Sequence, residues 1–238
     1  VDDREATFGR AKFLYAPDGD TDITFSIYGE HDRDGGFTLF DLASLSRNPY
    51  HLSHDYDGFT ERDVIAPSIT VRRHGDAIDF TSITAIERWS AKDVTDLDFT
   101  AIDLLRRGTD EDQVQFYQEF RINSAEDSPA AFRGNPLKFV AGISGSYSDF
   151  EHESYSEMSP TFQDFLAGAG RLDIVGLTFP IRDTAEYTLK DTTFGVWGHG
   201  TLTLSDKLDM SLGLRYEYER KHTDFNLAAL DLSSVTSP

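Results

Sequence analysis

The chain has 238 residues and no cysteine, which excludes disulfide bonds and thiol chemistry. Its 42 acidic and 22 basic side chains give a formal net charge of −20, which would repel a polyanion and argues against nucleic acid as a partner. No stretch approaches the ~20 consecutive apolar residues of a membrane-spanning helix, so a helical membrane protein is excluded as well.

Segments in which apolar and polar residues alternate occur in pairs along the chain. Residues 10–15 and 22–30 form the first pair, and Pro17 between them presets the backbone for a tight turn. Residues 65–73 and 77–89 form the second pair. Because successive side chains of a strand point to opposite faces, a period of two predicts strands with one apolar and one polar face.

The pattern continues over longer segments in the second half of the chain. Residues 113–123 and 137–147 form the third pair, and residues 192–204 and 208–221 form the fourth around a short polar turn. The sequence thus predicts an all-β protein with about eight antiparallel strands in four hairpins. The last two strands exceed the about five or six residues usual in soluble sheets, and their polar sides carry many charges. Both features are typical of a membrane barrel whose polar face meets water.

The connections between the predicted strands alternate between short and long. The turns within hairpins are short, although the third is somewhat longer, whereas residues 32–64, 90–112 and 153–190 join successive hairpins. Short turns at one end and long loops at the other are typical of outer-membrane barrels. Within the loops, the spacing of apolar residues predicts short helices at residues 98–106 and 161–166.

Eight charged residues fall on the side of the predicted strands opposite the apolar residues. On a lipid-facing surface each charge would cost ~2–4 kcal/mol near the membrane midplane. We therefore predict that they share a face turned toward water. They either line a lumen, where they contact a plug or a passing ligand, or simply pair with one another. The residues are Arg10, Lys12, Arg72, Glu119, Arg121, Arg215, Glu217 and Glu219.

Five aromatic residues lie near the ends of predicted strands that lead into the long loops. Amphipathic rings suit the headgroup layer of a membrane, so those that face lipid would form an interfacial girdle. Tyr28 falls on the polar side of its strand and does not fit this pattern. The five residues are Tyr28, Trp89, Tyr147, Tyr216 and Tyr218.

The first long loop contains His51, His54 and Asp55, which are candidates for a transition-metal site. The alternative is a polar loop without a ligand, because histidines three residues apart need a helix to align them. Neither a nucleophile with its base nor a glycine loop that would cradle phosphate is recognisable in the required context. We therefore expect neither catalysis nor a bound cofactor.

Four segments share features with one family and occur in the order in which that family has them. They are GRAKFLYAP at residues 9–17, QEFRI at 118–122, PLKFVAG at 136–142, and the hairpin at 194–216, which contains GLRY. Together they resemble the barrel of TonB-dependent outer-membrane receptors. The resemblance implies a larger barrel of about 22 strands with a plugged lumen in the bacterial outer membrane. It also implies uptake of a scarce nutrient such as a ferric siderophore, cobalamin or a glycan, driven by the inner-membrane TonB complex acting through the plug.

Residues 1–238 are expected to hold only part of such a receptor. About eight strands are about a third of that barrel, and neither a plug domain nor a TonB-contacting motif is recognisable. We interpret the chain as a partial barrel domain without the plug. Two alternatives share the alternating pattern: a soluble acidic β-sandwich that binds a ligand, and a complete small eight-stranded outer-membrane barrel. A sandwich would bury the apolar faces between two sheets, whereas a barrel would turn them outward.

Overall fold

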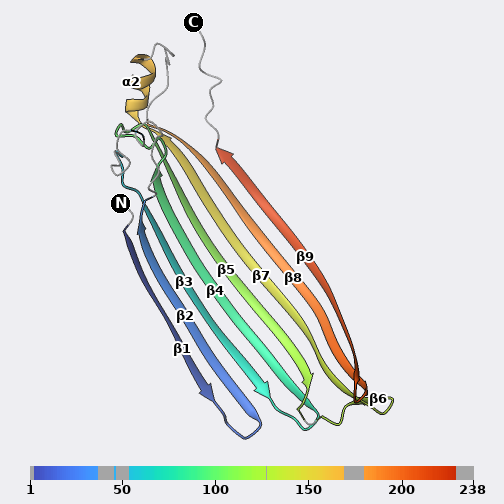
Figure 1. Cartoon of the computed structure of the whole chain (residues 1–238). Helices are drawn as coiled ribbons and strands as arrows, with labels where there is room; N and C mark the ends of the chain where they lie inside the picture. The colour runs from blue at the N-terminus through green and yellow to red at the C-terminus, as the bar shows by residue number, and fades with distance from the viewer. Residues whose placement is uncertain (1–2, 37–45, 47–53, 127, 169–179, 229–238) are drawn as a thin grey trace.

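A computed structural model describes residues 3–36, 46, 54–126, 128–168 and 180–228, most of which form one antiparallel β-sheet (Figure 1). Eight long strands follow one another in chain order across the sheet, and the short strand β6 pairs with β7. The predicted all-β meander is confirmed. The strands are β1 (Arg4–Tyr15), β2 (Thr21–Gly35), β3 (Phe59–Arg73), β4 (Ile78–Asp96), β5 (Leu105–Ser124), β6 (Ala131–Phe132), β7 (Asn135–Met158), β8 (Ile181–Ser205) and β9 (Leu208–Ala228).

All four predicted hairpins are present, but the strands run further into the predicted loops than the sequence pattern indicates. β7 spans 24 residues and β8 spans 25. At ~3.3 Å per residue, β8 is ~80 Å long, about three times the ~25 Å apolar height of an outer-membrane barrel. The connections are correspondingly shorter than predicted, and only residues 97–104 separate β4 from β5.

One of the two predicted loop helices is wrong and the other is confirmed. Residues 98–106 form a turn followed by the start of β5, because Asp96 Oδ1 accepts hydrogen bonds from the backbone N–H groups of Asp98 and Phe99. This local capping replaces the first turn of a helix. The helix predicted at residues 161–166 is present as α2 (Pro160–Gly168). Within the described ranges, no helix has both the length and the hydropathy needed to cross a membrane.

The register of the hydrogen-bond ladders fixes which residues share a face. Residues paired across neighbouring strands point to the same side of a sheet. Arg10 pairs with Tyr28, and the next residue, Ala11, pairs with Ile27. We call the side that bears Arg10 and Tyr28 the polar face, and the side that bears Ala11 and Ile27 the apolar face. A register shift occurs near the β8–β9 turn, between Thr203 and Ser205.

No layer packs against the apolar face in the part of the chain that the structure describes. Buried hydrophobic residues there are limited to Leu104, Ala125 and Ile181. By contrast, Leu212 and Leu214 in the middle of the apolar stripe on β9 are 67% and 75% exposed. A β-sandwich would bury these side chains between two sheets, and the described strands supply no second layer. The ladders also run from β1 to β9 without joining these two edges, so the described strands do not close into an eight-stranded barrel.

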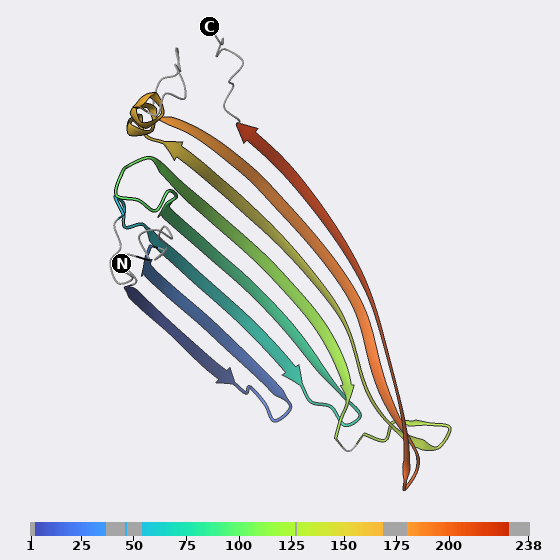
Figure 2. The same cartoon turned by 45° about the horizontal axis from the view of Figure 1, so that its top comes forward.

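The strands curve together and are staggered along the sheet (Figure 2). Following paired residues from Tyr15, at the end of β1, across every ladder leads to Tyr216, eight residues beyond Leu208 at the start of β9. A stagger of about eight residues, at ~3.3 Å each, over about seven spacings of ~4.8 Å corresponds to a strand tilt of about 38°. Strands of outer-membrane barrels tilt by about 35–45°, so the stagger has the size that a barrel requires.

We expect the 238-residue chain alone to aggregate in aqueous buffer, because it exposes the apolar face together with the unpaired edges β1 and β9. Analytical ultracentrifugation after refolding, with and without detergent micelles, tests this. The chain should sediment as large particles in buffer and disperse in micelles. A monodisperse water-soluble monomer would contradict the outward orientation of the apolar face.

Candidate functional site

The register places all eight predicted charged residues on the polar face, but it does not bring them to one point. They spread from β1, at one edge of the sheet, to β9, at the other. That this face lines a lumen stays a prediction. The residues are Arg10 and Lys12 on β1, Arg72 on β3, Glu119 and Arg121 on β5, and Arg215, Glu217 and Glu219 on β9.

Several of these residues pair with one another or with close neighbours. Arg121 Nε donates to Glu119 Oε1 at 2.9 Å, and the Glu119 residue is only 7% exposed. Arg215 Nε donates to Glu217 Oε2 at 2.8 Å, and Lys221 Nζ lies 2.9 Å from Glu219 Oε1. Much of the polar face is therefore electrostatically satisfied without a ligand.

A group of residues that, apart from Trp89, the sequence analysis did not single out lines a hollow on the polar face, at the loop end of β1 to β5. Five carboxylates face two guanidinium groups there, so the hollow carries a net negative charge. We call it the acidic hollow. It is lined by Arg4, Glu30, Asp32, Asp34, Thr60, Arg62, Val64, Glu87, Trp89, Ala91 and Glu111.

Arg62 organises the acidic hollow. Its Nη2 donates to Asp32 Oδ2 at 2.8 Å and also to Glu30, whose carboxylate accepts a hydrogen bond from the hydroxyl group of Tyr28. Arg62 thus joins two carboxylates, and Glu30 has both a cation and a hydroxyl group as partners.

Four rings form a continuous aromatic cluster beside the acidic hollow, also on the polar face. The ring centroids of Trp89 and Phe150 are 5.8 Å apart, as are those of Phe150 and Tyr187. His152 stacks on Tyr187 at 4.6 Å, and its Nδ1 lies 2.9 Å from a carboxylate oxygen of Glu111. Trp89 and Glu111 also line the acidic hollow, so the two features form one surface.

The prediction that Trp89 belongs to a lipid-facing girdle is wrong, because its register opposite Val64 and Gln113 turns it to the polar face. The residue type suggested a membrane interface, but counting in steps of two from Ile86 would have identified the correct face. Tyr28 also lies on the polar face, as its position in the sequence indicated.

The remaining predicted girdle residues, Tyr147, Tyr216 and Tyr218, lie on the apolar face and are 43%, 66% and 53% exposed. The next residues on this face toward the loops, Asp149 and Arg220, are charged. The tyrosines therefore stand where the apolar stripe ends, and the girdle itself stays a prediction.

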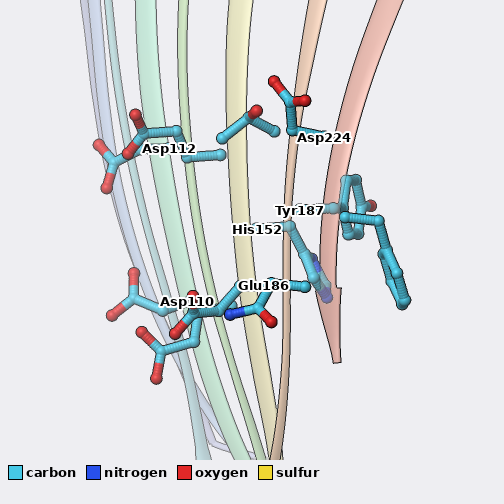
Figure 3. Close-up of a pocket in the computed structure, with 11 residues that line it drawn as sticks. Asp110, Asp112, His152, Glu186, Tyr187 and Asp224 are labelled. Carbon is cyan, nitrogen blue, oxygen red and sulfur yellow. The ribbon is translucent and has the colours of Figure 1, made fainter. Parts of the chain in front are cut away.

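Figure 3 shows a second hollow, whose lining residues come from both faces of the sheet. His152 and Tyr187 belong to the polar face, whereas Asp110, Asp112 and Glu186 belong to the side that carries the apolar stripe further down. In Figure 3 the two groups point in opposite directions. This region is therefore not one enclosed cavity, and its acidic residues form a charged belt beyond the apolar stripe.

Among the described residues, no group of potential metal ligands contains the predicted candidate His54. His51 lies outside the described residues, and the His54 ring lies 6.3 Å from that of Phe99. Asp55 instead lies beside Asp96 and Asp98, two carboxylates that the sequence analysis did not connect with it. These three residues also lie at the loop end of the sheet, but they do not line the acidic hollow.

The architecture is an open antiparallel meander that matches part of the barrel of a TonB-dependent receptor. The chain is similar to the crystal structure of the ferric yersiniabactin uptake receptor FyuA from Yersinia pestis, with a TM-score of 0.66 and 16% sequence identity. The similarity covers 93% of this chain and 31% of that receptor, so the chain spans about a third of the length of the protein it matches. No family model matches the sequence. At this identity the similarity establishes the fold.

Replacing Arg121 by Met is expected to destabilise the folded full-length protein by about 1–3 kcal/mol, because the buried carboxylate of Glu119 loses its charged partner. Urea unfolding in detergent micelles measures this difference. Adding Glu119→Gln should restore most of the loss, since a neutral amide needs no cation. Equal stability of the single and double variants would show that the pair carries no such energy.

Proposed function

We propose that the protein is an outer-membrane receptor for the energy-coupled uptake of a scarce nutrient such as a ferric siderophore, and that this chain forms about a third of its barrel. The observation that carries the proposal is the separation of the two faces. An exposed apolar stripe runs across one side of all eight long strands, while the other side holds the charged residues. Such a sheet is stable where one side meets hydrocarbon and the other meets water.

The geometry of the strands supports the same conclusion. Their tilt of about 38° is that of a closed outer-membrane barrel. The side chains on the apolar face change from apolar to charged along β7, where Tyr147 is followed on that face by Asp149 and then Glu151. On our proposal, this change marks the upper boundary of the hydrocarbon layer, and lipid of the outer membrane contacts the stripe below it.

The ligand is proposed to contact the acidic hollow and the aromatic cluster. Both lie on the polar face near the loop end, where a solute from outside would first meet the interior of the barrel. Rings offer a large rigid contact area, and the excess of carboxylates favours a ligand of neutral or positive charge, such as a metal chelate. The eight charged residues predicted from the sequence lie mostly deeper along the same face and would line the path below.

Residues 1–238 would serve as barrel wall in this receptor. Transport through so wide a barrel requires a plug, and energy would arrive from the inner-membrane TonB complex through that plug. The proposed role of this chain is therefore to contact membrane lipid with its apolar face and the ligand with its polar face.

Placing an arginine in the middle of the apolar stripe tests the membrane orientation. Leu214→Arg should cost ~2–4 kcal/mol at the midplane and sharply lower the amount of folded protein in the outer membrane. Ser211→Arg, on the polar face of the same strand, is the matched control and should assemble normally. Outer-membrane fractionation with heat-modifiability on gels gives both readouts. Equal assembly of the two variants would contradict the proposed faces.

Uptake of radiolabelled ferric chelates by cells that express the full-length protein tests the transport function. Accumulation of at least one neutral or cationic chelate should require both the protein and an intact TonB complex. Trp89→Ala should weaken chelate binding about tenfold or more, because an aromatic anchor of the proposed contact is lost.

Tyr218→Ala, which removes a ring of similar character from the apolar face, is the control and should leave binding unchanged. Chelate uptake that does not depend on the protein, or that persists without the TonB complex, would contradict the proposed function. Equal weakening by both alanine variants would move the ligand contact away from the aromatic cluster.

A further inference from the structure

Three aspartates from two separate connections of the chain meet at the loop end of the sheet. Asp55 precedes β3, Asp96 is the last residue of β4, and Asp98 follows it. One oxygen from each carboxyl group lies within 4.8 Å of the others. The backbone N–H of Asp55 donates to the carbonyl oxygen of Thr100 at 3.0 Å, so the two connections are held together by the fold. We call these three residues the aspartate cluster.

Asp96 is the buried member of the cluster, with only 2% of the residue exposed. Its Oδ1 accepts two backbone hydrogen bonds, both at 3.0 Å, from Asp98 and Phe99. Its Oδ2 is buried and has no hydrogen-bond partner. A buried charged oxygen without a partner is costly, so a cation at this position would stabilise it.

Arg106 is a basic residue that contacts the cluster through Asp55, and its Nε is buried without a hydrogen-bond partner, as Asp96 Oδ2 is. Its Nη2 lies 3.1 Å from Asp55 Oδ2 and 3.4 Å from an oxygen of Asp103, and its guanidinium group covers the ring of Tyr56. Asp98 has local donors, since Leu105 N–H donates to its Oδ2 at 2.9 Å and Thr100 N–H donates to its Oδ1 at 3.2 Å. One guanidinium group thus faces three close carboxylates, which leaves an excess of negative charge.

We propose that Asp55, Asp96 and Asp98 bind a divalent cation, with Ca²⁺ preferred over Mg²⁺. The donors are carboxylate oxygens, the ligand type that hard cations take. An ion that sits ~2.3–2.6 Å from each ligand, as Ca²⁺ does, fits between oxygens up to ~4.6–5.2 Å apart. Mg²⁺ demands a near-ideal octahedron at ~2.0–2.1 Å and dehydrates reluctantly, so three carboxylates from two connections suit the more flexible coordination of Ca²⁺ better. The bound ion would fasten the connection before β3 to the β4–β5 turn.

The aspartate cluster differs from the transition-metal site suggested by the sequence, which included two histidines of one loop. Its ligands are carboxylate oxygens from two connections. It also does not depend on the proposed transport function, since binding can be measured without any cargo. With three carboxylates and the remaining positions left to water or backbone carbonyl groups, we expect a dissociation constant of about 10⁻⁴–10⁻³ M, as in extracellular calcium modules.

The test uses the full-length protein in detergent micelles, freed of metal with a chelator. Ca²⁺ should raise the thermal unfolding temperature and bind in isothermal titration calorimetry, with Mg²⁺ at least about tenfold weaker. Asp96→Asn and Asp98→Asn should each weaken Ca²⁺ binding at least about tenfold. Asp110→Asn is the control, because this carboxylate lies at the same end of the sheet but outside the aspartate cluster and pairs with Lys92.

Heat-modifiability on gels confirms that each variant is folded before binding is compared. The proposal is overturned if Ca²⁺ neither binds nor stabilises the wild-type protein, or if Asp96→Asn and Asp98→Asn both bind Ca²⁺ as tightly as Asp110→Asn does. It is also overturned if Asp96→Asn is as stable as the wild type both with and without Ca²⁺. That last result would mean that a proton on Asp96, in place of a metal ion, satisfies the buried oxygen.

Discussion

The pairing register of the hydrogen-bond ladders is the constraint on which the rest of this structure depends. Side chains alternate between the faces with a period of two, so a slip of one residue in one ladder would move a whole strand of charges to the wrong side. The β2–β3 ladder, for example, keeps Ile27 opposite Pro67 and Tyr28 opposite Ala66. Because this relation is preserved from β1 into β9, the apolar stripe and the charged face are each continuous across eight strands.

The hairpins and the two faces could be predicted from the sequence because both follow from local periodicity. Glu217 and Leu214, for instance, are three residues apart on β9 and therefore lie on opposite faces. The loop ends of the strands could not be predicted, because the alternation disappears where both sides are polar. In β7 the outer residues change from Tyr147 to Asp149 and Glu151, and the sheet continues by backbone pairing that leaves no hydropathy signal.

The candidate sites escaped sequence reasoning for a different reason: their residues meet only after the sheet has formed. Asp55 and Asp96 lie far apart in the chain and are joined by the packing of two connections. The spacing of apolar residues after Asp96 suggested a helix. Hydrogen bonds from the following backbone N–H groups to the Asp96 side chain stabilise a turn there instead. The aromatic cluster likewise takes its rings from β4, β7 and β8, and no short motif contains them.

In the outer-membrane orientation proposed above, the length of β8 determines which part of the protein large molecules outside the cell would contact. From Lys190, the first charged residue on its outer side, the strand continues for ten residues to Ile181, paired with β7 throughout. At ~3.3 Å per residue and the tilt found above, this stretch rises ~25 Å beyond the apolar stripe. An antibody or bacteriophage would thus touch hydrogen-bonded sheet, with neighbouring contacts drawn from different strands. Epitopes in this region would be discontinuous and would vanish on denaturation.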